Sequence, residues 1–229
     1  MILCIETATR VCSAALCREG KPPGVKESHE QKSHASSLTV FIQDILEENS
    51  LTTGDLDAVA VSKGPGSYTG LRIGVSVAKG IAYASGLPLV AIPTTLSMYY
   101  GGKRLGDYDY YCPMIDARRM EVYTAVYDRE GNEIKEISAE IITEVSFSEI
   151  LDRGSMLFFG DGAGKSSELI KHPSATFNDS FTISSTDMCL PAFEAYKNKR
   201  FEDVAYFEPF YLKDFIATIP RKNILGNKE

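Results

Sequence analysis

The sequence lacks any run of about 18 uncharged apolar residues and any tract of low complexity. The first absence argues against a membrane-spanning helix, and the second favours an ordinary folded chain. The chain starts directly with a strand-like run over residues 2–6, without the basic segment and long apolar core of a secretory signal. We therefore expect a cytoplasmic protein with no membrane partner.

Clusters of basic residues are scarce as well. The 24 Lys and Arg residues are outnumbered by 31 Asp and Glu residues, the formal net charge is -7, and no run such as KKRK occurs. Because contacts to nucleic-acid phosphates need grouped positive charge, we expect the chain alone to bind RNA weakly. The adjacent pairs Lys103-Arg104 and Arg118-Arg119 are interpreted as solvated surface charge.

The five cysteines include no Cys-x-x-Cys pair. They are Cys4, Cys12, Cys17, Cys112 and Cys189, and most of them lie in apolar strand-like runs. An odd number without metal-ligand spacing predicts buried, reduced thiols, which favours a reducing compartment.

Histidine is rare, and nothing marks a catalytic residue. His29 and His34 are five positions apart, a spacing that does not align two side chains on one helix face, and His172 is distant in sequence. A surface pair is therefore favoured over a zinc site. No pattern marks a serine or cysteine nucleophile with a histidine base. We predict no metal, no cofactor and no catalytic residue.

The most informative segment is 64–74, GPGSYTGLRIG. A strand-like run precedes it, and its Gly-Pro-Gly start predicts a turn. Ser67 or Thr69 can cap the following helix, which we expect over residues 71–85.

This helix has few polar positions. Gly70, Gly74, Ala78 and Ala82 form a ridge of small residues, and Ile73, Val77 and Ile81 form an apolar stripe. A helix that flanks one sheet needs only one apolar face. The helix is therefore predicted to be covered on both sides, and the sequence does not decide which side meets the sheet.

The first half of the chain has a recognisable order of elements. Strands are expected at 2–6, 12–17 and 24–28 as an antiparallel meander, followed by an amphipathic helix at 35–48. Apolar runs at 57–62 and 87–92 flank the glycine-rich helix, which is typical of interior parallel strands. This is the order of a ribonuclease-H-like subdomain.

The second half repeats this order after a linker at 101–107, GGKRLGD. Strands are expected at 112–115, 122–127, 133–137 and 156–159, with helices near 147–152 and after Ala163. We predict an α/β protein of two ribonuclease-H-like subdomains, residues 1–104 and 105–229, with mixed sheets flanked by helices. A helix near 188–199 and a tail around 209–213 belong to a terminal region, from about 187, that can pack back on the first subdomain.

Two loops are weak candidates for binding a nucleotide. Residues 160–166, GDGAGKS, look like a Walker loop, but Phe159 stands where its first glycine is required, so a tight turn is favoured. In actin-like ATPases a first phosphate hairpin lies where this chain has Glu6 and Thr7, but the hairpin of the second half carries two arginines and no glycine. The weak candidates are Glu6, Thr7, Gly160, Asp161 and Gly162.

Taken in order, the motifs resemble the TsaB (YeaZ) family. They are residues 2–8, 64–74, 86–90, 116–118 with 121–123, 160–163, and the end Glu208-Pro209 with Tyr211-Leu212-Lys213. The resemblance implies an actin/Hsp70-like (ASKHA) fold. It also implies a role in forming N6-threonylcarbamoyladenosine beside the anticodon of tRNAs that read codons beginning with A.

The resemblance further implies a non-catalytic scaffold that activates the catalytic subunit TsaD, alongside a TsaE-like ATPase. The chain would reach tRNA only indirectly and form a homodimer when alone. TsaD holds a metal through a His-x-x-x-His pair, whereas Thr94 and Met98 occupy those positions here. The expected interface residues on helices 35–48 and 71–85 are Leu38, Phe41, Ile42, Ile45, Gly70, Leu71, Arg72, Ile73, Gly74, Val77, Ala78, Ile81 and Ala82. The alternative is a glycoprotease-type metallopeptidase or a weak actin-like ATPase.

Overall fold

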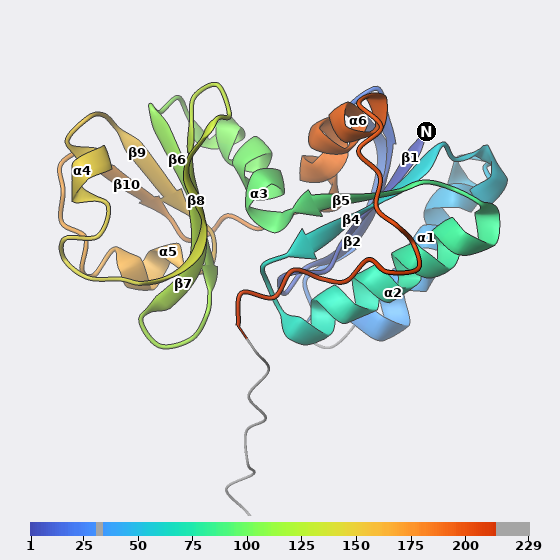
Figure 1. Ribbon diagram of the computed structural model, residues 1–229, viewed down its shortest axis with the longest axis horizontal. Coiled ribbons are helices and arrows are strands. Elements are labelled where there is room, and N and C mark those ends of the chain that lie inside the picture. The colour runs from blue at the N-terminus through green and yellow to red at the C-terminus, as the bar shows by residue number, and fades with distance from the viewer. Residues whose placement is uncertain (31–33, 214–229) are drawn as a thin grey trace, which may run out of the picture.

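The structure, a computed structural model, describes residues 1–30 and 34–213, except for the side chains of residues 34 and 35. The described chain forms two halves, each built on a five-stranded sheet (Figure 1). None of the described helices combines the length and the apolar character needed to cross a membrane.

The first sheet has the strand order β3-β2-β1-β4-β5. Its strands are β1 (Ile2–Glu6), β2 (Cys12–Arg18), β3 (Lys21–Ser28), β4 (Ala58–Gly64) and β5 (Leu89–Pro93). The antiparallel meander β1-β2-β3 and the parallel pairing β1-β4-β5 are confirmed. The prediction that both parallel strands are interior was wrong for β5, which lies at the edge of the sheet. Its outer side receives one bridge, in which the Glu202 N–H donates to the Leu89 carbonyl at 2.8 Å.

Helices cover both faces of the first sheet. α1 (His34–Glu48) and α2 (Tyr68–Ser85) pack on the face that carries Leu3, Ile5 and Leu16. The opposite face carries Ile2 and Cys4 and is covered by α6 (Cys189–Lys197). The alternation of side chains along β1 therefore supplies both cores. A short 3-10 helix, Thr53–Asp55, leads into β4.

The second sheet repeats the first, with the order β10-β9-β6-β7-β8. Its strands are β6 (Tyr110–Asp116), β7 (Glu121–Asp128), β8 (Glu133–Ile141), β9 (Met156–Phe159) and β10 (Ala175–Asn178). The repeated order read from the sequence is confirmed, although β10 was not predicted. The helices α4 (Ser148–Leu151) and α5 (Ala163–Ser166) are single turns, so the helix expected after Ala163 is much shorter than its counterpart α2.

The connecting helix α3 (Thr94–Gly102) was missed by the sequence reading, which placed a linker at 101–107. Its two terminal glycines serve packing. A Cβ on Gly102 would lie within 3.0 Å of the Phe159 ring, and one on Gly101 would lie 2.8 Å from the Asp187 carboxyl. Met98 and Tyr99 of α3 belong to the core of the second half, although the predicted boundary at residue 104 assigned them to the first.

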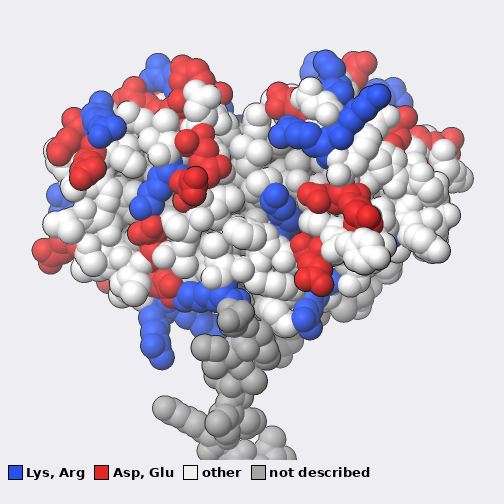
Figure 2. Space-filling model, in the orientation of Figure 1, with Lys and Arg blue, Asp and Glu red and all other residues white. Residues whose placement is uncertain are grey.

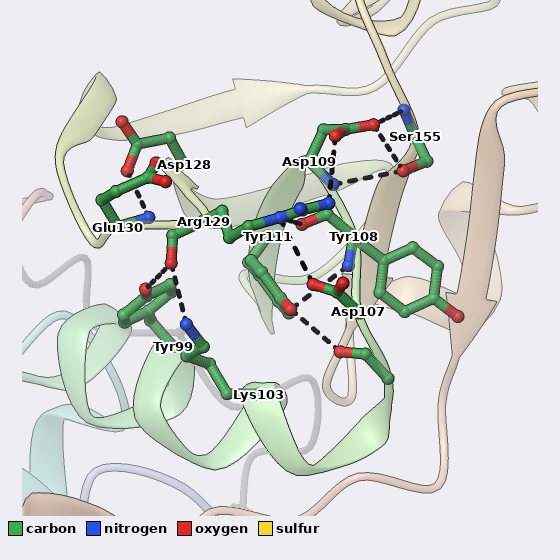
Figure 3. Close-up of polar contacts among 11 residues, drawn as sticks. Tyr99, Lys103, Asp107, Tyr108, Asp109, Tyr111, Asp128, Arg129, Glu130 and Ser155 are labelled. Atoms are coloured by element: carbon green, nitrogen blue, oxygen red, sulfur yellow. Dashed lines mark hydrogen bonds and ion pairs between the residues drawn. The ribbon is translucent and has the colours of Figure 1, made fainter.

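A polar network fixes the end of α3 to the second half (Figure 3). The Tyr99 hydroxyl and the Lys103 ammonium both donate to the Arg129 carbonyl, at 3.0 and 2.8 Å. The Arg129 guanidinium in turn pairs with Asp107 at 3.3 Å and with Asp109 at 3.2 Å. A 3-10 helix at Lys103–Leu105 lies within this network. The segment read as a linker is therefore held at several points.

The chain returns to the first half through a 3-10 helix, Ser185–Met188. The Ser185 N–H donates to the Ser13 hydroxyl of β2 at 2.7 Å. Buried Asp187 accepts from the Ser184 N–H at 3.0 Å and pairs with Arg104. The start of α6 is thereby fixed on the first sheet.

The prediction that all cysteines are reduced was wrong for one pair. Cys17 of β2 and Cys189 of α6 form a disulfide, with their Cα atoms 5.4 Å apart and 172 residues between them in sequence. Cys4, Cys12 and Cys112 are free and buried, as expected. The Cys4 sulfur lies 3.4 Å from that of Cys17. The two cysteines meet only because α6 returns to the first sheet. Their spacing in the sequence therefore could not predict the disulfide.

Candidate protein-binding surface

The start of α2 is set by the turn that precedes it. The Ser67 hydroxyl accepts from the Gly70 N–H at 3.3 Å, so Ser67 rather than Thr69 caps the helix. The helix therefore begins at Tyr68, three residues before the predicted start. The Ser67 N–H donates to the Ala8 carbonyl at 2.7 Å and ties the cap to the turn between β1 and β2.

The small-residue ridge of α2 faces the inside of the protein. The Thr7 hydroxyl donates to the Gly70 carbonyl at 2.8 Å. A Cβ on Gly70 would overlap the Thr7 carbonyl oxygen, and one on Gly74 would overlap the Thr7 hydroxyl. Ala78 and Ala82 continue the ridge and are buried. The two glycines thus allow the helix to approach the β1-β2 turn closely, which settles which side meets the sheet.

The apolar stripe of α2 lies at the border between core and solvent. Ile73, Val77 and Ile81 are half-buried and pack against the same core as Phe41 of α1, which is itself half-buried. Part of each side chain therefore remains accessible. Together α1 and α2 present one shared apolar edge.

Gly80 makes no close contact with the described residues around it. A Cβ built on it would meet no atom within 4 Å, and Ser76 and Ala84 beside it are exposed. Glycine in a helix interior destabilises the helix by about 1 kcal/mol relative to alanine. The contacts that explain Gly70 and Gly74 are absent at Gly80 within the described residues, so packing inside the described chain does not account for a glycine at this position.

The opposite flank of α2 is covered by the C-terminal segment 203–213, called the strap below, which crosses in front of the helix in Figure 1. The Lys79 ammonium donates to the Ala205 and Phe207 carbonyls at 3.2 and 2.8 Å. The Phe210 N–H donates to the Lys63 carbonyl at 2.6 Å. Since α2 is covered here by its own chain, the side of α2 that stays open within the described chain is the one toward α1.

The far end of the strap reaches the second half. Tyr211 packs against Tyr68 with ring centroids 4.9 Å apart, and the Arg72 guanidinium lies 4.2 Å from the Tyr68 ring centroid. Lys213 then forms an ion pair with Glu121 of β7. The strap thus contacts both halves.

The predicted interface residues differ in how far they are exposed. Most members lie in the core of the chain itself: Leu38, Ile42, Ile45, Gly70, Leu71, Gly74, Ala78 and Ala82. Phe41, Ile73, Val77 and Ile81 are half-buried, and Arg72 is exposed but engaged with Tyr68 and Tyr211. Ser76, Gly80 and Ala84, which are exposed, are not in the predicted set, because its small residues were those of the ridge at Gly70, Gly74, Ala78 and Ala82.

The loop that carries Glu6 is occupied by internal contacts. Glu6 is fully buried, and its carboxylate accepts from the Ala8 N–H at 2.6 Å and from the Ser62 hydroxyl. Burial raises the pKa of Glu6 to about 7, against the opposing effect of these two donors. Glu6 and Thr7 therefore support the packing of the glycine-rich segment.

The loop at 160–166 is likewise held internally. The Asp161 carboxylate accepts from the Asp116 N–H at 2.8 Å, and the Gly162 N–H donates to the Met114 carbonyl at 3.1 Å. Lys165 pairs with Asp116 and donates to the Arg119 and Glu121 carbonyls at 2.8 and 2.7 Å. These contacts, with a helix of one turn, support a tight strand-to-helix turn.

The positions of potential metal ligands are now visible. Thr94 and Met98 are buried, and a Cβ on Gly160 would lie 2.6 Å from the Met98 methyl carbon, so Met98 fills the space beneath that turn. His29 lies 3.4 Å from Glu27 in the first half, and His172 lies 3.3 Å from Asp152 in the second. The side chain of His34 is outside the described residues.

One group of three potential ligand atoms occurs among the described residues, the sulfur atoms of Cys4, Cys17 and Cys189, all within 4.8 Å of one another. Two of these atoms are joined in the disulfide. Burial raises the pKa of the Cys4 thiol well above its ordinary value, which disfavours the thiolate that a metal requires.

Comparison with known proteins gives consistent results. Residues 18–216 match the family described as TsaD, tRNA N6-adenosine threonylcarbamoyltransferase. The tRNA threonylcarbamoyladenosine biosynthesis protein TsaB of Escherichia coli (strain K12) is 31% identical over 222 residues, which are 94% of this chain and 96% of that protein. TsaB of Bacillus subtilis (strain 168) is 30% identical over 136 residues, 59% of this chain and 58% of that protein.

Solved structures show the same fold. YeaZ from Pseudomonas aeruginosa superposes with a TM-score of 0.82 at 25% identity and covers 92% of this chain and 99% of that one. A second Pseudomonas aeruginosa structure, described as an uncharacterized protein with similarity to peptidase YEAZ, gives a TM-score of 0.83 at 25% identity, over 93% of this chain and 99% of that one. With near-complete coverage of the Escherichia coli relative, these matches show that the chain belongs to the TsaB (YeaZ) family of tRNA threonylcarbamoyladenosine biosynthesis proteins.

Proposed function

We propose that this chain is a non-catalytic scaffold for forming N6-threonylcarbamoyladenosine on tRNA, and that it acts by binding a TsaD-like subunit through α1 and α2. The observation that carries the proposal is the surface around Gly80. Ser76, Gly80 and Ala84 are small and exposed, and half-buried Ile73 and Val77 border them. Such a surface allows a partner helix to approach closely.

The match of this chain to the TsaD family supports a partner of related fold. Two related proteins can present equivalent helix pairs to each other, and α1 with α2 is a pair of long helices that leaves apolar side chains partly accessible along its shared edge. When the TsaD-like subunit is absent, the same surface forms a homodimer. A TsaE-like ATPase joins the complex through the TsaD-like subunit.

The absence of a catalytic role is supported by how the candidate loops are used. Glu6, Asp161 and Lys165 are engaged in contacts that hold the two strand turns together. Thr94 and Met98 are buried at the positions of the expected ligands. The scaffold then affects rate by favouring the competent conformation of its partner. The peptidase alternative is favoured only by the description of a structural neighbour, since the one metal-ligand group among the described residues is the three cysteine sulfur atoms, two of them in a disulfide.

The test is a pair of substitutions at Gly80. Gly80→Ala should stabilise the isolated chain by up to about 1 kcal/mol, because alanine favours the helix. Gly80→Leu should keep the fold, since a Cβ there meets open space. It should weaken binding of the TsaD-like subunit about 10- to 100-fold, the effect of overpacking an interface by roughly 1–3 kcal/mol.

Titration calorimetry with the purified TsaD-like subunit measures this effect. Lys197→Leu is the matched control, because Lys197 is an exposed helix residue on α6, on the other side of the sheet. If Gly80→Leu folds and binds as tightly as the unaltered chain, α2 is not in the interface and the proposal fails.

A further inference from the structure

The hairpin between β6 and β7 has an unusual tip. Arg118 and Arg119 both adopt left-handed backbone conformations, with φ of 69° and 53°. The hairpin is closed by the Ala117 N–H donating to the Glu121 carbonyl at 3.1 Å and the Glu121 N–H donating to the Arg118 carbonyl at 3.2 Å. Consecutive left-handed positions in a hairpin favour Asn and Gly, and side chains such as arginine destabilise them.

Neither guanidinium group is neutralised within the described chain. Arg118 and Arg119 are exposed, and no ion pair joins either of them to a described carboxylate. The carboxylates at the base of the hairpin are already engaged: Asp116 pairs with Lys165, and Glu121 pairs with Lys213. The strained tip thus presents two positive charges to solvent.

A third arginine approaches from the first half. Arg10 is exposed in the turn between β1 and β2 and lies close enough to Asp161 to influence its carboxyl group. The Asp161 carboxylate in turn accepts from the Asp116 N–H at the hairpin base. Figure 2 shows Lys and Arg side chains gathered at the lower edge of the molecule, near the point where the described chain ends.

We propose that this hairpin binds the phosphodiester backbone of RNA, with Arg118 and Arg119 contacting phosphates and Arg10 adding to the positive field. The planar guanidinium fork matches phosphate oxygens, and two adjacent arginines on a rigid turn can reach neighbouring phosphates. The interpretation of this pair as ordinary solvated charge does not account for arginine at two left-handed positions. The identity of the RNA as tRNA rests on the proposed function.

The negative charge of the rest of the chain restricts where RNA can bind. The formal net charge is -7, so most of the surface repels a polyanion. A cationic hairpin on such a chain would direct RNA to one edge. It would add to a binding site whose larger part lies on the partner subunit.

The experiment replaces both arginines by glycine, Arg118→Gly with Arg119→Gly. Glycine accepts the left-handed conformation, so the variant should fold and melt at a higher temperature than the unaltered chain. In the complex with the TsaD-like subunit, the affinity for a tRNA transcript at 0.1 M salt should fall about tenfold. The slope of log K against log salt should fall by about two, one for each lost phosphate contact.

The matched control is Lys199→Gly with Arg200→Gln. It also removes two adjacent exposed charges and replaces a left-handed residue, because Lys199 has φ of 53° after α6. Its affinity and salt slope should be unchanged. The isolated chain at low ionic strength gives a second readout that needs no partner, and there the arginine variant should lose the residual tRNA binding that the control keeps.

Equal tRNA affinity and salt slope for the arginine variant and the unaltered chain would overturn the proposal, as would an equal loss in the control. A variant that keeps tRNA affinity but releases the TsaD-like subunit would assign the hairpin to an acidic protein surface and overturn it as well. If the unaltered chain does not pair with the TsaD-like subunit, the proposed function fails. The isolated-chain measurement then decides the RNA contact by itself.

Discussion

The two halves of this protein share a strand order and differ in what covers the sheet. The first sheet is flanked by α1 and α2, of 15 and 18 residues, whereas α4 and α5 of the second half have 4 residues each. In the first half, the long helices leave half-buried apolar side chains at their shared edge. In the second half, aromatic side chains such as Phe158 and Phe177, which stack at 4.9 Å, fill the space. The same strand order therefore carries a helix pair with an apolar edge in one half and compact aromatic packing in the other.

The largest expected difference between the halves is in how much stability a Gly→Ala substitution in a helix removes. Gly70→Ala should destabilise the protein by about 3 kcal/mol, because its Cβ would overlap the Thr7 carbonyl oxygen, which belongs to the backbone. Gly164→Ala in α5 should change the stability by less than about 1 kcal/mol, since its nearest contact is the Asp179 carboxylate at 3.2 Å. Urea denaturation of both variants measures the difference, and equal losses would contradict the comparison.

Gly74→Leu belongs to the same test. Gly74 is one of the predicted interface residues, but it faces Thr7 inside the chain. The variant should fail to fold, whereas Gly80→Leu should fold. Circular dichroism melting separates the two cases.

The next largest effect is the pH dependence of stability that comes from the buried carboxyl group of Glu6 in the first half. The pKa of Glu6 is raised from 4.5 to about 7 by burial, so the folded state holds its proton more tightly than the unfolded state. The stability that this proton supplies is fully present below pH 4.5 and is lost as the pH rises through about 7. Glu6→Gln should remove that dependence and be more stable than the unaltered chain at pH 8 by about 3 kcal/mol.

Denaturation midpoints from pH 4 to pH 8 test this prediction. A midpoint that is lower for Glu6→Gln than for the unaltered chain at pH 8 would show that the ionised carboxylate is stabilising in place. Ser62→Ala is a useful companion, because it removes the hydroxyl that donates to Glu6. It should raise the pKa of Glu6 in the folded state further, so that the loss of stability continues to higher pH and is larger in total.

The smallest expected effect is the loss of stability when a lysine that donates to two backbone carbonyls is replaced, and each half has one such lysine. Lys79 donates to two strap carbonyls, and Lys165 donates to two hairpin carbonyls and also pairs with Asp116. Lys79→Met should cost about 1 kcal/mol and Lys165→Met somewhat more, because the second loses an ion pair in addition. Thermal melting of both variants gives the order, and a larger loss for Lys79→Met would reverse it.

Much of the fold could be read from local patterns. The alternating and apolar runs located nine of the ten strands, and the Gly-Pro-Gly turn with Ser67 located the start of α2 to within three residues. The tenth strand, β10, has four residues and no alternation of burial that would mark it. α3 was missed because Gly101 and Gly102 usually signal flexibility, while here they permit contact with Asp187 and Phe159.

The candidate site could be predicted only in part, for a related reason. The pattern of α2 showed two apolar sides, but the choice between them depends on Thr7, which is distant in sequence. The strap and the Cys17–Cys189 pair depend on the return of the C-terminal segment. The sequence alone cannot distinguish Gly80 from the packed glycines of α2, because the difference is that no described atom lies near Gly80.

The most direct test of the scaffold account is the rate of threonylcarbamoyladenosine formation on tRNA, reconstituted with the TsaD-like and TsaE-like subunits. The variants are Glu6→Gln, Asp116→Asn and Asp161→Asn, the carboxyl groups of the two strand turns. The account predicts that all three fold, bind the TsaD-like subunit and support the rate of the unaltered chain within about threefold. A variant that keeps binding but loses about a hundredfold in rate, the size expected for a catalytic acid or base, would contradict it.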